Sequence, residues 1–321
     1  MLVLNDGQIR SLGFRWPELA DRIERAVRVL DNGDFAQPIK PYLRYRDPRN
    51  RIIAMPAFLG GEFDMAGIKW IASFPGNLEL GLPRAHGVIV LNRADTGQPT
   101  AILAGGAPNL LRTAAVSGLM LRRWLETRPE AAPLRIAIFG WGPIGRAHFD
   151  MCASLFGDRI GRFLLHDPRG VEAASIPQAW RDRTDIVPEW QEAYGGCNVC
   201  ITCTVADRRY IDRPPADGAL LLNVSLRDYR IEALRSLQAI VVDDWEEVCR
   251  ENTDIELLHR ENGLLPAGTA SIADVVCRDA LRGWDPAEPV LFCPMGMAVF
   301  DLAVAGYLAG LARQAGVGTE I

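Results

Sequence analysis

Histidine is scarce in this chain, and there is no excess of basic charge. Only four histidines occur in 321 residues, and acidic side chains outnumber basic ones, giving a net charge of −5 and a pI near 5.5. Nucleic-acid phosphates and anionic lipid surfaces do not attract such a chain. We therefore expect neither a nucleic acid nor a membrane as a partner.

Long apolar runs are also missing. No stretch approaches the roughly 20 apolar residues of a membrane span. The opening segment, MLVLNDGQIRSLGF, carries neither a basic region nor a sustained apolar run, so we expect no signal peptide. The seven cysteines are an odd number in a long chain that is 49% hydrophobic, and reduced thiols in the cytoplasm are the simplest interpretation.

Three of the cysteines, Cys197, Cys200 and Cys203, are spaced like metal ligands. They fall in an apolar run typical of a strand, where alternation would send Cys200 to the opposite face from the other two. No second cysteine cluster completes a site. We therefore expect no metal ion.

The first hundred residues predict an α+β unit. A helix is indicated at 17–32, where Pro17 suits the first turn and apolar side chains recur on one face. Short β-like runs follow, separated by turn-prone residues, at 51–55, 67–73, 87–92 and 100–105. A long helical pattern then extends from about 109 to 125.

The pattern changes at residue 134, where strands and helices begin to alternate. The continuous apolar runs typical of buried parallel strands lie at 134–140, 162–167, 197–204, 219–225, 239–244 and 290–293. This alternation predicts an α/β fold with a Rossmann-type, doubly wound parallel sheet. The last helix, at 296–315, is apolar almost all round, so it must be buried against the first domain or in an oligomer interface.

A glycine-rich turn follows the first of these strands and opens a helix. It consists of Gly140, Trp141, Gly142, Pro143, Ile144 and Gly145. Gly140 permits the tight turn, Gly142 lets the backbone approach a pyrophosphate, and Gly145 allows close helix–sheet packing. The helix N-terminus then faces the phosphates with its partial positive charge. The complete order of strand, turn, helix, strand and acid favours a dinucleotide site over a glycine turn without a ligand.

The acid in this order is Asp167, which ends the next strand 22 residues after Gly145. Its carboxylate would accept hydrogen bonds from the adenosine ribose and repel a 2′-phosphate, which favours NAD over NADP. Arg169 is close enough to complicate that choice. Thr204 and Ser225 end two further strands, and their position predicts that they line the cofactor crevice.

Many small motifs occur in one order along the rest of the chain. The hallmarks are the strand with Lys69, the turns Pro75–Asn77 and Gly81–Pro83, the run TGQP at 96–99, RTAA at 112–115 and PMGMAVFD at 294–301. Over essentially its whole length the sequence resembles the ornithine cyclodeaminase/μ-crystallin family. Stretches such as KWIASFP at 69–75 and SLRD at 225–228 are similar to the branch that makes L-2,3-diaminopropionate, a building block of siderophores and peptide antibiotics.

That resemblance implies an NAD-dependent enzyme. Its substrate would be N-(2-amino-2-carboxyethyl)-L-glutamate, a secondary amine with three carboxylates, and its products 2-oxoglutarate and L-2,3-diaminopropionate. It also implies a homodimer with two domains. Residues 1–113, with 296–321 packing back, would bind the small amino-acid substrate and form the dimer, and residues 114–295 would bind NAD.

A ligand with three carboxylates needs several cations. Lys69 lies inside an apolar run and Arg112 among apolar helical residues, which are costly places for unpaired charges. The resemblance makes Arg44, Lys69 and Arg112 carboxylate ligands, and snorkelling or salt-bridged side chains are the structural alternative. The position of Arg84 is not basic in ornithine cyclodeaminases, so this extra cation suits an extra carboxylate.

Asp228 follows the fifth strand of the second domain. The matching aspartate of the family acts in acid–base chemistry, so we interpret Asp228 as the catalytic acid–base group, assisted by Lys69. The alternative is a helix N-cap for a segment that begins at Tyr229 or Arg230.

Other functions remain open at this point. An ornithine cyclodeaminase, or another amino-acid dehydrogenase or imine reductase of the family, is the nearest alternative. A non-catalytic dinucleotide-binding protein is disfavoured because Lys69, Arg112 and Asp228 are all retained.

Overall fold

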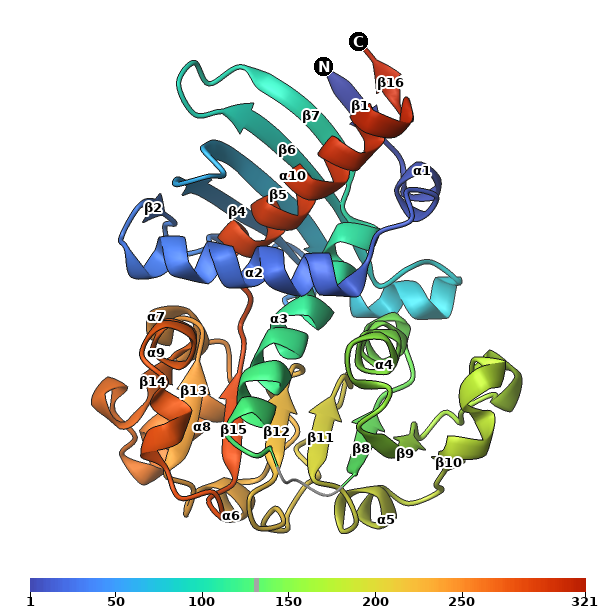
Figure 1. The fold of residues 1–321 in the computed structure, drawn as a ribbon, viewed down its shortest axis with the longest axis vertical. Helices are drawn as coiled ribbons and strands as arrows, with labels where there is room; N and C mark the ends of the chain where they lie inside the picture. Colours follow the sequence, from blue (N-terminus) through green and yellow to red (C-terminus); the bar gives the residue numbers. More distant parts are fainter. Residues whose placement is uncertain (130–132) are drawn as a thin grey trace. The chain divides into compact units, whose positions relative to one another are not determined.

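The computed structural model describes residues 1–129 and 133–321. The chain divides into two compact units (Figure 1). Residues 1–115 and 296–321 form the first unit, and residues 116–295 form the second unit. None of the helices in the described ranges could cross a bilayer.

The first unit is built on one eight-stranded sheet, in the order β16-β1-β7-β6-β5-β4-β2, with β3 also paired to β4. All pairs are antiparallel except β1 with β7. The strands are β1 (Leu2–Leu4), β2 (Phe35–Ala36), β3 (Tyr42–Leu43), β4 (Arg51–Leu59), β5 (Met65–Ser73), β6 (Ala85–Arg93), β7 (Pro99–Ala104) and β16 (Thr319–Glu320). The β-like runs of the sequence are therefore strands.

Two long helices cover one face of this sheet. Helix α2 (Trp16–Asp31) packs against α10 (Ala298–Ala315), which in turn packs against β4, β5 and β6. Because α10 has apolar residues on almost every side, it is buried between α2 and the sheet. The short helix α1 (Asp6–Arg10) follows β1, and the 3-10 helix η1 (Pro75–Leu80) connects β5 to β6.

Helix α3 (Gly106–Glu126) begins in the first unit and ends in the second. The second unit is a parallel eight-stranded sheet with the order β10-β9-β8-β11-β12-β15-β13-β14. Its strands are β8 (Leu134–Phe139), β9 (Ile160–His166), β10 (Thr184–Ile186), β11 (Val199–Thr202), β12 (Leu220–Asn223), β13 (Ala239–Val242), β14 (Ala270–Ser271) and β15 (Val290–Cys293).

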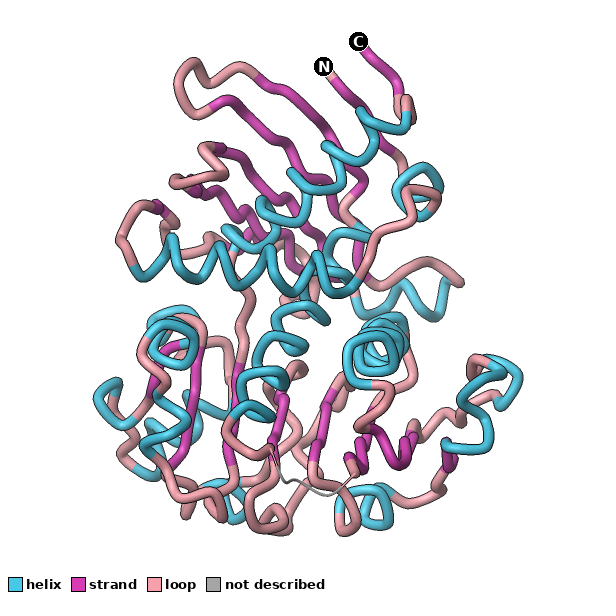
Figure 2. Tube along the Cα trace, viewed as in Figure 1, coloured by secondary structure: helices cyan, strands magenta, loops and turns pink. Residues whose placement is uncertain are grey.

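Helices alternate with these strands, as Figure 2 shows. They are α4 (Pro143–Phe156), α5 (Trp190–Tyr194), α6 (Ile231–Leu234), α7 (Trp245–Val248), α8 (Asp254–Asn262) and α9 (Ile272–Cys277). The strand order reverses between β8 and β11, which is the switch point of a Rossmann-type sheet. The α/β fold expected from the sequence is confirmed.

One expectation about this sheet was wrong. Strand β11 covers only residues 199–202, so Cys197 precedes the strand and the alternation argument does not apply to it. Cys197 and Cys200 belong to the same buried cluster, whereas the sulfur of Cys203 lies 3.8 Å from Nδ1 of His148. Within the described residues, no group of histidine, cysteine and acidic side chains could hold a metal ion.

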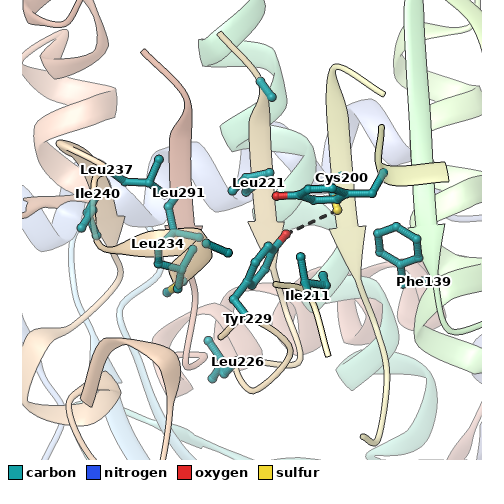
Figure 3. Close-up of a cluster of buried hydrophobic side chains, with 14 of the residues drawn as sticks. Phe139, Cys200, Ile211, Leu221, Leu226, Tyr229, Leu234, Leu237, Ile240 and Leu291 are labelled. Atoms are coloured by element: carbon teal, nitrogen blue, oxygen red, sulfur yellow. Dashed lines mark hydrogen bonds between the residues drawn. The ribbon is translucent and has the colours of Figure 1, made fainter. Parts of the chain in front are cut away.

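The cluster of buried side chains that contains Cys200 packs against one face of the parallel sheet (Figure 3). The hydroxyl of Tyr229 lies 3.4 Å from the sulfur of Cys200, and Leu226 packs into the same cluster. Tyr229 is fully buried and Leu226 is 5% exposed. These two side chains anchor the short segment that contains Asp228.

Candidate active site

The glycine turn lies at the carboxyl end of β8. Gly140 has a φ of +93°, a conformation that side chains rarely adopt. A Cβ on Gly140 would lie 2.5 Å from the carbonyl oxygen of Cys203, and one on Gly145 would lie 2.0 Å from the carbonyl oxygen of Gly140. Both positions therefore require glycine because the backbone packs so closely.

Gly142 has a different role in this turn. It is the N-cap of α4, its residue type offers no capping side chain, and an added Cβ would meet nothing within 4 Å in the described chain. The first turn of α4, PIGR, contains no acidic residue. The helix thus presents backbone N–H groups and its positive dipole end to open space, which suits a pyrophosphate.

Asp167 is tied directly to this turn. It follows β9 and accepts the backbone N–H of Trp141 at 2.8 Å and that of Arg169 at 2.9 Å. Burial by itself would raise the pKa of Asp167, but hydrogen bonds from Arg169 and Trp141 outweigh it and hold the pKa below its ordinary value. Trp141 also donates its indole N–H to Ser175 at 2.7 Å. The acid and the glycine turn are therefore one hydrogen-bonded assembly.

Asp228 lies beyond the end of β12 and is fully buried. Its carboxylate accepts the hydroxyls of Thr204 and Ser225. Helix α6 begins at Ile231 with Arg230 as its N-cap, so the alternative interpretation of Asp228 as an N-cap is wrong. The structure thus brings together Thr204, Ser225 and Asp228. Because the two hydroxyl hydrogens point at Asp228, these residues are left as acceptors toward any further ligand.

A buried ionic cluster joins three elements of the first unit. Lys69 on β5 lies with its Nζ 2.8 and 2.9 Å from the two carboxylate oxygens of Asp301 on α10. Arg112 on α3 donates its Nε–H to Asp301 at 3.1 Å. Asn109 accepts from both cations, at 3.1 Å from Lys69 and 3.3 Å from Arg112. Lys69 is 1% exposed and Asp301 is fully buried.

Two cations therefore share one carboxylate. Burial and the charge of Arg112 together lower the pKa of Lys69 to about 7, although Asp301 opposes the shift. The turn before α10 fits closely around Arg112, because a Cβ on Gly296 would lie 2.4 Å from its Nη1. Gly296 also has a φ of +91°, so this position needs glycine on both grounds.

The other two predicted cations are held by different segments. Arg44 is exposed just after β3, with its guanidinium 5.1 Å from the ring centroid of Tyr42. Arg84 is half-buried just before β6, and its carbonyl accepts the backbone N–H of Phe74 at 2.9 Å. The ionic cluster around Asp301 is built from Lys69 and Arg112.

Sequence reasoning missed Asp301, Asn109 and a third buried cation, Lys40, whose charge also depresses the pKa of Lys69. A signal for Asp301 was present. An aspartate in a helix that is otherwise apolar all round needs a buried cation, and Lys69 in an apolar strand needs a buried anion. The sequence thus indicates that each of these charges needs a buried partner, but it does not show that the two charges pair with each other.

The parallel sheet and the glycine turn define a dinucleotide-binding protein of the Rossmann type. The model of the ornithine cyclodeaminase/mu-crystallin family matches residues 3–315, and the chain therefore belongs to this family. The family resemblance read from the sequence is confirmed.

Among its relatives is the N-((2S)-2-amino-2-carboxyethyl)-L-glutamate dehydrogenase of Staphylococcus aureus, 32% identical, with 100% of this chain and 98% of the relative covered. The Δ1-pyrroline-2-carboxylate reductase of Thermococcus litoralis, solved with NADH and L-proline, has the same fold, with a TM-score of 0.88, 24% identity and both chains fully covered. An archaeal alanine dehydrogenase dimer with bound NAD aligns with a TM-score of 0.81 and 24% identity, over 100% of this chain and 98% of that chain.

The ionic cluster yields a stability prediction. Asp301→Asn should cost about 3–5 kcal/mol of unfolding free energy, because it leaves two buried cations without their anion. Urea unfolding followed by tryptophan fluorescence measures this. Asp95→Asn, which breaks the exposed pair with Arg93, is the matched control and should leave the stability nearly unchanged. Equal effects of the two substitutions would contradict the assignment of a buried cluster.

Proposed function

We propose that this protein uses NAD to oxidise N-(2-amino-2-carboxyethyl)-L-glutamate, giving 2-oxoglutarate and L-2,3-diaminopropionate. The observation that carries the proposal is the buried cluster in which Lys69 and Arg112 share the single carboxylate of Asp301. Such a cluster retains positive charge in a place sheltered from water. A carboxylate of the substrate compensates this charge and forms charge-assisted hydrogen bonds.

Arg44 and Arg84 extend this recognition to the remaining carboxylates. Both are cations of the first unit, and both stand on segments next to the long strands β4 and β6. The strand β4 reads RIIAMPAFL and offers no carboxylate for a substrate ammonium. This charge pattern favours a carboxylate-rich amine over ornithine.

NAD is held by the second unit. The backbone N–H groups at the start of α4 bind its pyrophosphate, and the ionised Asp167 accepts from its adenosine ribose and disfavours a 2′-phosphate. When bound, NAD supplies the acceptor for the hydride that leaves the glutamate Cα. Thr204 and Ser225 hold the carboxylate of Asp228 near the carboxyl ends of β11 and β12.

Asp228 performs the proton transfers of the reaction. Loss of hydride from the Cα converts the secondary amine to an imine, and the amine proton passes to the Asp228 carboxylate. Asp228 then assists the addition of water to the imine carbon and protonates the nitrogen as the carbon–nitrogen bond breaks. Lys69, with a pKa near neutrality, is able to hold or release a proton in the same steps.

The most direct test is NADH formation. With N-(2-amino-2-carboxyethyl)-L-glutamate the protein should reduce NAD and release one 2-oxoglutarate per NADH, both measured by absorbance and coupled assay. Ornithine, alanine and glutamate are the controls. If NADH forms only with alanine, or if ornithine is converted to proline without net NADH, the proposed reaction is wrong and the protein catalyses the reaction of another family member.

The variant Asp228→Asn belongs in the same assay. Asparagine keeps the shape, and its amide oxygen can accept one hydroxyl while its amide N–H donates to the other, but it cannot carry the proton, so kcat should fall by about 100-fold or more. Unchanged turnover would remove Asp228 from the mechanism.

The pKa of Lys69 gives a pH prediction. As pH rises through about 7, Lys69 loses its proton and the cluster loses one positive charge, so kcat/KM for the tricarboxylate amine should fall. Lys69→Arg should abolish this limb, because a guanidinium stays protonated. The substrate titrates in the same way in both assays, so its own ionisation cannot cause a difference between the wild type and the variant. Melting curves check that the variant is folded. If kcat/KM falls with pH in the same way in the wild type and in Lys69→Arg, the titrating group is not Lys69.

A homodimer is also part of the proposal. The face of the first-unit sheet opposite α10 carries cross-strand rows of apolar side chains, namely Ala54–Trp70–Val88 and Pro56–Ile68–Val90–Ile102. Trp70 is 41% exposed and the others are half-buried. An apolar sheet face of this kind favours association with a second copy of the chain.

Trp70→Glu tests this surface. The charge should convert a dimer to a monomer, measured by size-exclusion chromatography with light scattering, because a carboxylate would be buried without a partner. Leu265→Glu, at an exposed site of the second unit, is the matched control and should remain dimeric. A monomeric wild type, or a Trp70→Glu variant that remains dimeric, would contradict this interface.

A further inference from the structure

The segment that carries Asp228 is a strained turn. It leaves β12 at Asn223, and Leu226 adopts a φ of +67°, a conformation that a leucine takes only when its surroundings impose it. Asn223 accepts the backbone N–H of Leu226 at 3.0 Å and the hydroxyl of Thr202 at 3.0 Å. The hydrogen bonds around the turn, rather than its own backbone preference, therefore fix its shape.

Four hydrogen bonds of this turn converge on Asp254, the first residue of α8. Its backbone N–H donates to the carbonyl of Leu226 at 2.8 Å. Its Oδ2 accepts the backbone N–H groups of Asp228 at 3.2 Å and Tyr229 at 3.3 Å, and the side-chain amide of Asn223 at 2.9 Å. One buried residue thus holds the turn both before and after the reactive side chain.

Arg209 completes this arrangement. It donates its Nε–H to Oδ1 of Asp254 at 2.6 Å and its Nη2–H to the carbonyl of Asn252 at 2.7 Å. Asp254 is fully buried, and Arg209 is 18% exposed at the side chain. The ion pair keeps a charged acceptor beneath the turn, and charged acceptors bind backbone N–H groups about twice as strongly as neutral ones.

We propose that Asp254, paired with Arg209, is a positioning residue that fixes the Asp228 turn and thereby sets the rate of the chemical step. The proposal rests on the proposed function in that Asp228 is taken as the proton-transfer group. Asp254 acts through the backbone of Asp228, and its own side chain is fully buried beneath the turn. Its loss should therefore reduce kcat and leave KM for the amine and the affinity for NAD within about twofold.

Two variants and a control test the proposal on the full chain. Asp254→Asn retains the size but removes the charge, and Arg209→Met removes the ion-pair partner. Glu247→Gln is the matched control, because Glu247 is also a buried carboxylate of the second unit paired with an arginine, Arg250 at 2.7 Å, but it lies on α7. Melting temperatures of all three proteins report the purely structural cost.

The first measurement needs no substrate. Amide hydrogen exchange over 226–229 should accelerate by about tenfold or more in Asp254→Asn and Arg209→Met relative to Glu247→Gln. Unchanged protection of these amides would overturn the proposal. If the wild type oxidises none of the amines tested, the proposed function fails, and this exchange measurement still decides whether Asp254 fixes the turn.

The second measurement is the pH profile of kcat with the amine that the wild type oxidises. Burial raises the pKa of Asp254 to about 6, and Arg209 opposes that shift. Removing Arg209 raises this pKa further, so the acidic limb of kcat should move to higher pH in Arg209→Met and return in Arg209→Lys. A kcat that falls no more than in Glu247→Gln, a loss confined to KM, or an acidic limb that does not move would each overturn the proposal.

Discussion

The buried pairing of Lys69 and Arg112 with Asp301 is the interaction on which the first unit depends. It joins the middle of the sheet, helix α3 and the C-terminal helix α10, three segments that are far apart in the sequence. Burying three charges is expensive, and a hydrophobic replacement would serve stability as well or better. We propose that this cluster, in which two cations share one anion, is retained because it can bind a carboxylate of the substrate.

In the second unit, two carboxylates fix the conformation of loops. Asp167 holds the backbone of the glycine turn through the N–H of Trp141, and Asp254 holds the backbone of the Asp228 turn through two N–H groups. In both cases an acid fixes a loop that follows a different strand of the parallel sheet. Regular secondary structure brings the loops to one edge of the sheet, and these hydrogen bonds give each loop a single conformation.

Much of this could be predicted from the sequence, because the features are local. The glycine turn, the following helix and Asp167 stand at characteristic spacings, and apolar runs mark the buried strands. Long-range pairing was not accessible in the same way. The partner of Lys69 lies 232 positions away on α10, and the partner of the Asp228 backbone lies on α8. The face of the sheet on which Cys197 lies was predicted wrongly because β11 is shorter than the apolar run in the sequence. Tertiary contacts decide where such a strand begins and ends.

We propose that Lys69 and Arg112 together recognise a substrate carboxylate. A crystal structure of the protein with NADH and 2-oxoglutarate, the proposed product, tests it most directly. We expect a carboxylate oxygen of 2-oxoglutarate within hydrogen-bond distance of Lys69 Nζ and the Arg112 guanidinium, with Asp301 still in contact with both. A ligand whose carboxylates are bound entirely by other residues would show that Lys69 and Arg112 do not recognise the substrate.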